Sequence, residues 1–378
     1  MSRIEKSLSV AKLDVVLLRA PIATPRRNAF GVQTSRPALL VRLEDIDGAH
    51  GWGEVFANWP PGGAEHRANL LSAVFSMLTT AKKFTSPMQL FEKLTEATHL
   101  LALQCGEPGP FAQCISGLDA AAWDLVARRA GVPLWQALSN QDTPHPLPAY
   151  ASGLVADRIN DLALEAKAAG YRAYKLKIGF DREADIAAFT KLRSAVGSDA
   201  NLMADANQVW SFSEAREMAT ALAPFDLAWL EEPLASDAPM AYWRSLSGEA
   251  PMPLAAGENM RGEAMFVAAD YLKFVQPDVA KWGGISLVYK VASAAVARGQ
   301  VFCPHFLGGA LGLYASAHVL AAVGGGGYLE IDVNPNPLRT ELLNMPPRIV
   351  EGQFVLPDGP GLGVEPDLTR AQQWGVAI

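Results

Sequence analysis

The chain has 378 residues, of which 50% are hydrophobic and 19% charged, and its formal net charge is −7. This much apolar sequence can fill a buried core, which excludes a disordered or fibrous chain, and the length fits two domains or one large barrel with an addition. The acidic balance and the lack of a basic run argue against nucleic acid as a partner. No apolar stretch is long enough to cross a membrane, the first residues form no signal-peptide core, and three cysteines make no paired framework. We therefore expect a cytoplasmic protein with no membrane partner.

Residues 1–145 differ in pattern from the rest of the chain and predict an α+β domain. Apolar runs at 13–18, 38–45 and 52–56 predict a small antiparallel sheet with a hairpin turn at Asp47-Gly48. Helical periodicity follows at 64–81, 87–103 and 110–130, and the Pro-rich stretch 142–148 predicts a linker.

Residues 146–335 have a regular pattern in which eight short apolar runs alternate with helical stretches. Strands separated by helices of about 10–15 residues predict parallel βαβ units, and eight such units predict a closed TIM-type (β/α) barrel. We expect its strands within 148–153, 171–179, 201–208, 227–233, 253–259, 273–280, 301–306 and 328–333. Residues 336–378, rich in Pro and Gly, break the pattern and are expected to pack back on the N-terminal domain.

Ionisable residues stand near the C-terminal ends of these otherwise apolar strands, where such barrels place their chemistry. They are spread over seven successive strands, which salt bridges alone do not explain. The set is Lys175, Lys177, Asp205, Glu231, Glu258, Asp278, His305 and Glu330.

Lys175 and Lys177 alternate with apolar neighbours and should both point into the barrel. Two buried ammonium groups are tolerable beside carboxylates, and their repulsion is expected to lower the pKa of one towards that of a usable base. A Schiff-base aldolase also uses a barrel lysine, but that chemistry leaves the second lysine unexplained.

Asp205, Glu231 and Glu258 are expected on three adjacent strands. Three carboxylates brought together without a cation would destabilise one another, and an all-oxygen set favours Mg²⁺ over zinc. The alternative is that each acid pairs with a lysine or arginine. Glu232 should face the other way.

Asp278 and His305 are expected at the ends of neighbouring strands, where the acid would fix the tautomer of the histidine and raise its basicity. This pairing indicates a general acid or base. A lone histidine would more often be structural.

Seven motifs together resemble the enolase superfamily, specifically its mandelate racemase subgroup. The N-terminal region also resembles the α+β capping domain of that family, with the C-terminal segment completing it on a modified TIM barrel. The motifs are KLK (175–177), DANQ (205–208), EEP (231–233), GEN (257–259), PDVAKWGG (277–284), PHF (304–306) and LE (329–330).

The resemblance implies roles for these residues. Asp205, Glu231 and Glu258 would bind Mg²⁺, and Lys177 and His305, the latter paired with Asp278, would be acid/base groups on opposite faces of a carboxylate substrate. Lys175 and Glu330 would hold the substrate carboxylate as it becomes an enediolate. The muconate-lactonizing subgroup has a lysine in place of Asp278 and lacks this histidine, and the manganese-dependent subgroup has a histidine in place of Asn207, so both are disfavoured. Lys281 resembles a lysine found in both the racemase and lactonizing subgroups.

Two outcomes follow from an enediolate. Expulsion of a β-hydroxyl protonated by His305 converts an acid sugar, or a related 2,3-dihydroxy acid, to a 2-keto-3-deoxy acid. Return of the proton from the opposite face gives racemisation or epimerisation of a 2-hydroxy acid. We favour the dehydratase, a lyase, over the isomerase, because dehydration is the commoner outcome with this set of residues. A barrel that has lost catalysis is the remote alternative, since every expected position is filled.

Specificity should come from the capping domain closing over the barrel mouth. Its stretches 26–31 and 56–66 offer polar contacts and apolar walls that hint at a short acid or one with an apolar tail. The candidate substrate contacts are Arg27, Asn28, Phe30, Asn58, Trp59 and His66. Family resemblance also implies a homo-oligomer.

Overall fold

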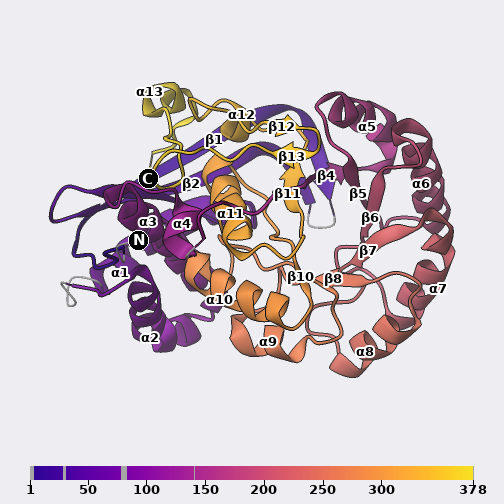
Figure 1. Cartoon of the computed structure of the whole chain (residues 1–378), viewed down its shortest axis with the longest axis horizontal. Coiled ribbons are helices and arrows are strands. Elements are labelled where there is room, and N and C mark those ends of the chain that lie inside the picture. Colours follow the sequence, from indigo (N-terminus) through magenta and orange to yellow (C-terminus); the bar gives the residue numbers. More distant parts are fainter. Residues whose placement is uncertain (1–3, 29–30, 78–82, 140, 378) are drawn as a thin grey trace.

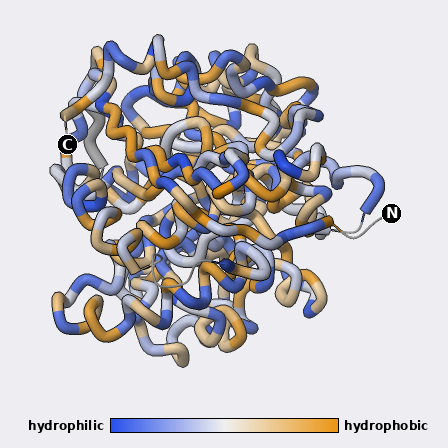
Figure 2. Tube along the Cα trace, turned by 90° about the vertical axis from the view of Figure 1, so that its left-hand side faces the viewer, coloured by the Kyte–Doolittle hydropathy of each residue, from blue (hydrophilic) through white to orange (hydrophobic). Residues whose placement is uncertain are grey.

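The computed structural model describes residues 4–28, 31–77, 83–139 and 141–377. A barrel lies beside a smaller domain formed mainly by the N-terminal part of the chain (Figure 1). Hydrophobic and hydrophilic stretches alternate at short intervals along the trace (Figure 2), as expected where each element buries one face. None of the helices in these ranges has both the length and the apolar character needed to cross a bilayer.

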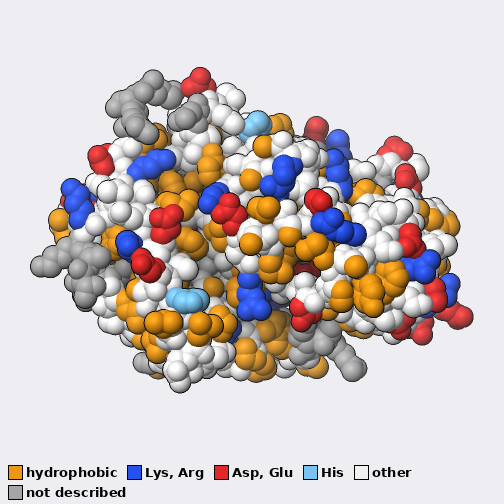
Figure 3. Space-filling view, turned by 90° about the horizontal axis from the view of Figure 1, so that it is seen from below, with side chains coloured by type: hydrophobic (Ala, Val, Ile, Leu, Met, Phe, Trp, Pro, Cys, Tyr) orange, Lys and Arg blue, Asp and Glu red, His pale blue; other side chains and the backbone are white. Residues whose placement is uncertain are grey.

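The surface shown in Figure 3 carries both signs of charge. Lysine and arginine side chains are interspersed there with aspartate and glutamate, and hydrophobic side chains lie between them in small groups. On this face the charges form no continuous basic stripe of the kind that binds a nucleic acid backbone.

The N-terminal sheet has three antiparallel strands in the order β1-β2-β3. They are β1 (Val10–Asn28), β2 (Gly31–Asp45) and β3 (His50–Val55). The predicted turn at Asp47-Gly48 joins β2 to β3, and Gly48 adopts a φ of 84° that suits glycine. The prediction of strands at 13–18 and 38–45 was too short. Pairing of β1 with β2 resumes beyond an irregularity at residues 21–26, with Arg26 opposite Gln33 and Asn28 opposite Gly31.

Four helices complete this part of the chain: α1 (Gly63–Ser76), α2 (Pro87–Cys105), α3 (Pro108–Arg129) and the short α4 (Leu134–Leu138). Helix α3 packs directly on β3 because the glycines of this strand face the helix and have no side chains to hold it away. A Cβ atom at Gly53 would stand 2.1 Å from the carbonyl oxygen of Gly117, and one at Gly51 would stand 2.2 Å from that of Ala121. Residues Trp52 and Glu54 alternate with these glycines, so their side chains leave β3 on its other face.

The eight predicted strands form one parallel sheet in the order β10-β9-β8-β7-β6-β5-β4-β11. They are β4 (Ala149–Leu154), β5 (Ala173–Lys177), β6 (Asn201–Asp205), β7 (Leu227–Glu231), β8 (Leu254–Ala256), β9 (Phe274–Val275), β10 (Val301–Phe302) and β11 (Leu329–Asp332). The helices between them are α5 (Ile159–Ala168), α6 (Arg182–Val196), α7 (Phe212–Leu222), α8 (Met240–Glu249), α9 (Gly262–Ala268), α10 (Gly284–Ala297) and α11 (Ala310–Val323). The fold is a modified TIM barrel with a capping domain, as predicted.

The barrel interior is filled below its mouth by side chains from successive strands. Tyr150, Ala173, Met203, Trp229, Ala255 and Cys303 form this inner cluster. The gap between β10 and β11 is bridged by the Tyr328 amide, which donates to Cys303 Sγ at 3.3 Å. Cys303 and Cys114 are buried and Cys105 is exposed, and all three are free thiols.

The C-terminal segment contains α12 (Pro337–Thr340), a small hairpin of β12 (Ile349–Val350) and β13 (Gln353–Phe354), and α13 (Leu368–Ala371). It runs beside β1 in Figure 1, where the Val376 amide donates to the Leu17 carbonyl at 2.9 Å. Arg128 of α3 also donates to Glu365 at 2.6 Å. These contacts join the segment to the N-terminal sheet, while domain boundaries at residues 145 and 335 stay a prediction.

Two buried carboxylates of the capping domain lie at the N-termini of two barrel helices. Asp119 of α3 accepts from the amide and hydroxyl of Ser286, in the first turn of α10. Glu54 of β3 accepts from the amides of Gly309 and Gly312, at the start of α11. The first amides of a helix have no partner within it and attract negative charge, so each acid satisfies donors that would otherwise be buried alone.

Replacing Asp119 by alanine leaves those donors without an acceptor, and we expect the free energy of unfolding to fall by about 1–3 kcal/mol. Burial raises the pKa of Asp119 from 3.8 to about 7, against the hydrogen bonds from Ser286. Between these two values the folded protein holds a proton that the unfolded chain has lost, so the stability that Asp119 contributes falls as the pH rises through this window.

Urea unfolding of the native protein and Asp119→Ala at about pH 5 and about pH 8 measures this difference, with the exposed Asp142→Ala as control. The gap should be larger at the lower pH. A gap that is absent, or wider at the higher pH, contradicts this account.

Candidate active site

The predicted site residues meet at the mouth of the barrel, where the strands end. Strand pairing sets Lys177 opposite Asp205 and Asp205 opposite Glu231, so these side chains lie at one level. Glu258 follows β8 after Gly257, whose φ is 151°. A Cβ at Gly257 would come within 2.6 Å of the Gln276 amide nitrogen, so only glycine lets the chain pass β9 and bring Glu258 to the mouth.

Lys175 lies at the centre of the buried network and is fully inaccessible to solvent. Its Nζ contacts the Glu231 carboxylate, stands 2.8 Å from Glu330 and lies 3.7 Å from Asp205. Burial lowers the pKa of Lys175, but Glu231 and Glu330 outweigh it and hold the pKa well above its usual value. Lys175 is therefore a fixed ammonium group that joins carboxylates from three strands.

Glu231 has more partners than the sequence suggested. Its Oε2 accepts from Gln276 at 2.6 Å and from the indole of Trp229 at 3.0 Å. Burial, together with Asp205 and Glu330, raises the pKa of Glu231 to about 7, although Lys175 opposes the change. The positive charge within the network does not fully balance this carboxylate.

Lys177 donates to Asp205 at 2.6 Å, and its side chain is 24% exposed. Burial and the neighbouring Lys175 lower its pKa, yet Asp205 raises it further, and the net direction is upward. Repulsion by Lys175 therefore acts in the predicted direction, but the predicted net lowering of the pKa of one lysine is wrong for this arrangement, because an acid contacts each ammonium group.

His305 and Asp278 form the predicted pair, with Nδ1 of the imidazole 2.7 Å from the carboxylate. The other ring nitrogen, Nε2, faces Glu258. Burial lowers the pKa of His305, but Glu258 and Glu330, with the hydrogen bond to Asp278, hold it well above the usual value. Because Asp278 engages Nδ1, Nε2 is the nitrogen available for chemistry.

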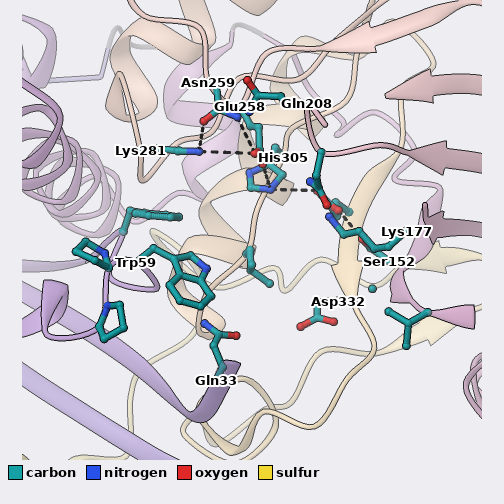
Figure 4. Close-up of a pocket in the computed structure, with 18 of the residues that line it drawn as sticks. Gln33, Trp59, Ser152, Lys177, Gln208, Glu258, Asn259, Lys281, His305 and Asp332 are labelled. Atoms are coloured by element: carbon teal, nitrogen blue, oxygen red, sulfur yellow. Dashed lines mark hydrogen bonds and ion pairs between the residues drawn. The ribbon is translucent and has the colours of Figure 1, made fainter. Parts of the chain in front are cut away.

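A cavity of about 370 Å³ lies above this network. Figure 4 shows Lys177, Glu258 and His305 on one side of it and Gln33, Trp59 and Asp332 on the other. Among the eight predicted barrel residues, Lys177, Glu258, His305 and Glu330 line the cavity, whereas Lys175, Asp205, Glu231 and Asp278 lie beneath it among the buried polar groups.

Of the predicted capping-domain contacts, some lie at the cavity and others do not. Trp59 lines the cavity. Asn58 is buried beside it, and its amide donates to the Leu307 carbonyl instead. His66 lies on α1, half exposed and 3.0 Å from Glu107, away from the cavity lining. Phe30 and the side chains of Arg27 and Asn28 fall outside what the structure describes.

Several polar residues of the site were missed by the sequence analysis. Gln276 holds Glu231, Ser152 donates to Glu330 at 2.6 Å, and Gln33 reaches the cavity from β2. Glu54 had a usable signal, a lone acid in the apolar strand 51–55. The other three are uncharged residues for which only the tertiary arrangement shows a role.

The three carboxylates proposed as metal ligands each contact a basic side chain: Asp205 with Lys177, Glu231 with Lys175, and Glu258 with His305. In the described part of the chain, no three aspartate, glutamate, histidine or cysteine side chains are positioned to bind one metal ion in the conformations that they adopt here. The donor set nevertheless suits a hard divalent cation. Even with His305 protonated, the negative groups of the network outnumber the positive ones by one, and a divalent cation would offset this negative charge. The network consists of Asp205, Glu231, Glu258, Asp278, Glu330, Lys175, Lys177, Lys281 and His305.

Two family models match the chain, and together they span most of it. Residues 11–139 match the mandelate racemase / muconate lactonizing enzyme N-terminal domain, and residues 158–371 match the enolase C-terminal domain-like family.

Two relatives of known activity align over nearly the whole chain. D-galactarolactone cycloisomerase from Agrobacterium fabrum is 31% identical, with 95% of this chain and 96% of the relative covered. Arabinonate dehydratase from Saccharolobus solfataricus is 29% identical, with 88% and 92% covered.

Solved structures share the fold. A mandelate racemase/muconate lactonizing enzyme from Bordetella bronchiseptica RB50 superposes with a TM-score of 0.89 at 46% identity, covering 97% of this chain and 99% of its own. A racemase from Streptomyces coelicolor A3(2) with bound magnesium gives a TM-score of 0.84 at 28% identity, covering 97% and 100%.

Proposed function

The chain belongs to the enolase superfamily, in its mandelate racemase subgroup, and from that premise we propose that it removes the proton α to the carboxylate of a small acid. The reaction that we propose is dehydration of an acid sugar, or a related 2,3-dihydroxy acid, to a 2-keto-3-deoxy acid. The relatives include a dehydratase, a cycloisomerase and a racemase.

The observation that carries the proposal is the placement of two acid/base groups on one cavity. Lys177 ends β5, and His305 follows β10, three strands away round one side of the barrel and five round the other. A substrate carbon bound between these two side chains would be approached by them from two directions. A proton can therefore be taken on one face and a group protonated on the other.

In the first step Lys177 takes the α-proton, for which it must first release to solvent the proton that its contact with Asp205 favours, and the electron pair of the C–H bond moves into the carboxylate to give an enediolate. We assign that carboxylate a position beside Glu330, which lines the cavity and contacts Lys175 at 2.8 Å, so that a fixed ammonium group beneath it would balance the developing charge. The site excludes water around Lys175, which strengthens this interaction.

In the second step the enediolate electrons expel the β-hydroxyl as His305 donates its Nε2 proton to it, and water leaves. The resulting enol takes up a proton at carbon 3 and becomes the keto acid. Asp278 keeps the imidazole oriented through both proton transfers, because its carboxylate accepts from Nδ1.

Asp205, Glu231 and Glu258 are proposed to hold Mg²⁺, whose charge would make the α-proton more acidic and stabilise the enediolate. A relative with bound magnesium and the charge deficit of the network support this assignment.

The apolar part of the cavity favours a second candidate reaction, racemisation or epimerisation. Phe56, Trp59, Pro60 and Phe180 line it, and a racemase or epimerase acting on a 2-hydroxy acid with an apolar tail would fit such walls. The homo-oligomer and the cytoplasmic location stay predictions.

Incubation of the protein and Mg²⁺ with a panel of acid sugars and 2-hydroxy acids, followed by NMR and mass spectrometry, tests the reaction. We expect one acid to lose water and give a 2-keto-3-deoxy product, with activity abolished by EDTA. Lys177→Met should reduce the rate by about 10²–10⁴, since a positioned base contributes that much. The exposed Lys290→Met serves as control.

Inversion at the α-carbon with the skeleton intact would make the protein a racemase or epimerase. An isomer formed by opening a ring, without loss of water, would make it a cycloisomerase. Conversion that EDTA leaves unchanged would contradict the metal assignment.

Magnesium binding has its own test, independent of turnover. Isothermal titration of the native protein should show one Mg²⁺ per chain, and Asp205→Asn should weaken the affinity at least about tenfold, because a charged oxygen donor is lost. Glu183→Gln, at an exposed position of α6, should leave it unchanged. Equal affinity in the native protein and Asp205→Asn would rule out Asp205 as a ligand.

A further inference from the structure

Glu232 is a buried carboxylate that the proposed mechanism does not use. As expected, its contacts differ from those of Glu231: both Glu232 oxygens accept from Asn259 Nδ2, at 3.0 and 3.2 Å. Its φ of 41° lies in the left-handed region, which residues with a side chain seldom adopt, so the fold holds Glu232 there at a cost in strain. Strained residues cluster at functional sites, and Asn259 connects Glu232 to one.

The amide of Asn259 has partners at both of its ends. Its Nδ2 donates to Glu258 Oε1 at 2.9 Å as well as to Glu232, and its Oδ1 accepts from Lys281 Nζ at 2.6 Å. Because an ammonium group can only donate, the contact with Lys281 determines which end of the amide is the oxygen. The NH₂ group then faces the two carboxylates, and the orientation of the amide is determined by its partners.

Both oxygens of the Glu258 carboxylate are engaged by neighbouring side chains. Oε1 accepts from Asn259 and lies 3.7 Å from Lys281 Nζ, and Oε2 faces His305 Nε2. Figure 4 shows these four side chains gathered on one side of the cavity. His305 is a proposed acid/base group, so Asn259 is the hydrogen-bond partner of Glu258 that takes no part in proton transfer.

Lys281 is held from the capping domain as well as from the barrel. The ring of Phe56, just after β3, lies 5.3 Å from Lys281 Nζ, which is a cation–π contact. The Phe56 amide also donates to the Ala280 carbonyl at 3.3 Å. The donor to Asn259 is therefore itself fixed in place by its surroundings.

We propose that Asn259 is a positioning residue that fixes the Glu258 carboxylate for a small divalent cation, with Glu232 and Lys281 holding the two ends of its amide. Outer hydrogen bonds of this kind orient metal ligands, and the loss of one weakens metal affinity by about 10–100-fold. Mg²⁺ demands a nearly ideal octahedral arrangement, whereas Ca²⁺ accepts flexible ones, so a fixed Glu258 favours Mg²⁺ over Ca²⁺. This inference rests on the proposed function for the assignment of Glu258 as a ligand.

Isothermal titration of Mg²⁺ and of Ca²⁺ into the native protein and Asn259→Leu tests the proposal. Leucine has nearly the same size and no charge, so this change removes the hydrogen bonds and leaves the charge of the site as it was. We expect the Mg²⁺ affinity to fall at least about tenfold and the Ca²⁺ affinity to fall less, so the ratio of the two affinities drops. A change in electrostatics or in overall stability would move both affinities alike, because the two ions carry the same charge.

Gln300→Leu is the matched control for the loss of a buried amide. Gln300 precedes β10, at the opposite end of this strand from His305, and its Nε2 donates to the carbonyls of Ala269 and Leu272 at 2.9 Å each. Its replacement should lower the urea concentration at the midpoint of unfolding and leave both ion affinities unchanged.

Asn259→Asp serves as a second variant in case Asn259→Leu does not fold. It keeps an oxygen for Lys281 and replaces only the donor. The added charge attracts both ions, but the ratio of Mg²⁺ to Ca²⁺ affinity should still fall.

An unchanged ratio of affinities in a folded Asn259 variant, or an equal fall of that ratio in Gln300→Leu, would overturn the proposal. The outcomes also separate this inference from the proposed function. If Asp205→Asn weakens Mg²⁺ binding and the Asn259 variants bind both ions as the native protein does, the inference is wrong and the metal assignment stands. If the native protein binds no Mg²⁺, the metal assignment is refuted and the inference falls with it. A lowered ratio in a protein that converts no acid would support the inference and refute the reaction alone.

Discussion

Charge balance in a volume closed to water is the constraint on which this protein depends. The barrel mouth gathers carboxylates from several strands, and an ammonium or imidazole group contacts each of them. Lys175 joins three of them, yet the pKa of Glu231 still rises to about 7 under the influence of burial, Asp205 and Glu330. The remaining negative charge favours the proposed divalent cation, which would supply charge that the network lacks and would let an anionic substrate bind beside it.

The capping domain shapes this site from outside the barrel. Asp119 and Glu54 hold the starts of α10 and α11, the helices that follow the segments carrying Asp278 and His305. Glycines in β3 let α3 approach closely enough for this arrangement, so a local feature of the N-terminal sheet bears on the orientation of a proposed acid/base pair. The same domain supplies Gln33 and Trp59 to the cavity. The capping domain therefore both packs on the barrel helices and lines the cavity.

The sequence predicted the barrel and its charged layer because both follow from local rules. Apolar runs alternating with helices determine the parallel strands, and charges in buried strands such as those carrying Lys175 and Asp205 are rare enough to indicate a site. Gln33 could not be found in this way, because its place at the cavity comes from extended pairing of β1 with β2, which leaves no pattern. The pKa of Lys177 was misjudged for a similar reason: the sequence shows the neighbouring lysine, whereas the contact with Asp205 is formed by the fold.

The most direct test of the account is exchange of the substrate α-proton with solvent. The protein is incubated in D₂O with Mg²⁺ and acids that bind it, and the α-proton signal is followed by NMR in the native protein, in Lys177→Met and in His305→Asn. If one of these residues breaks the α C–H bond, the native protein should remove the α-proton signal or place deuterium in the product. Neither change should occur when the residue that takes the proton is replaced. An acid that is converted with its α-proton fully retained, or exchange that survives in both variants, would contradict the central claim.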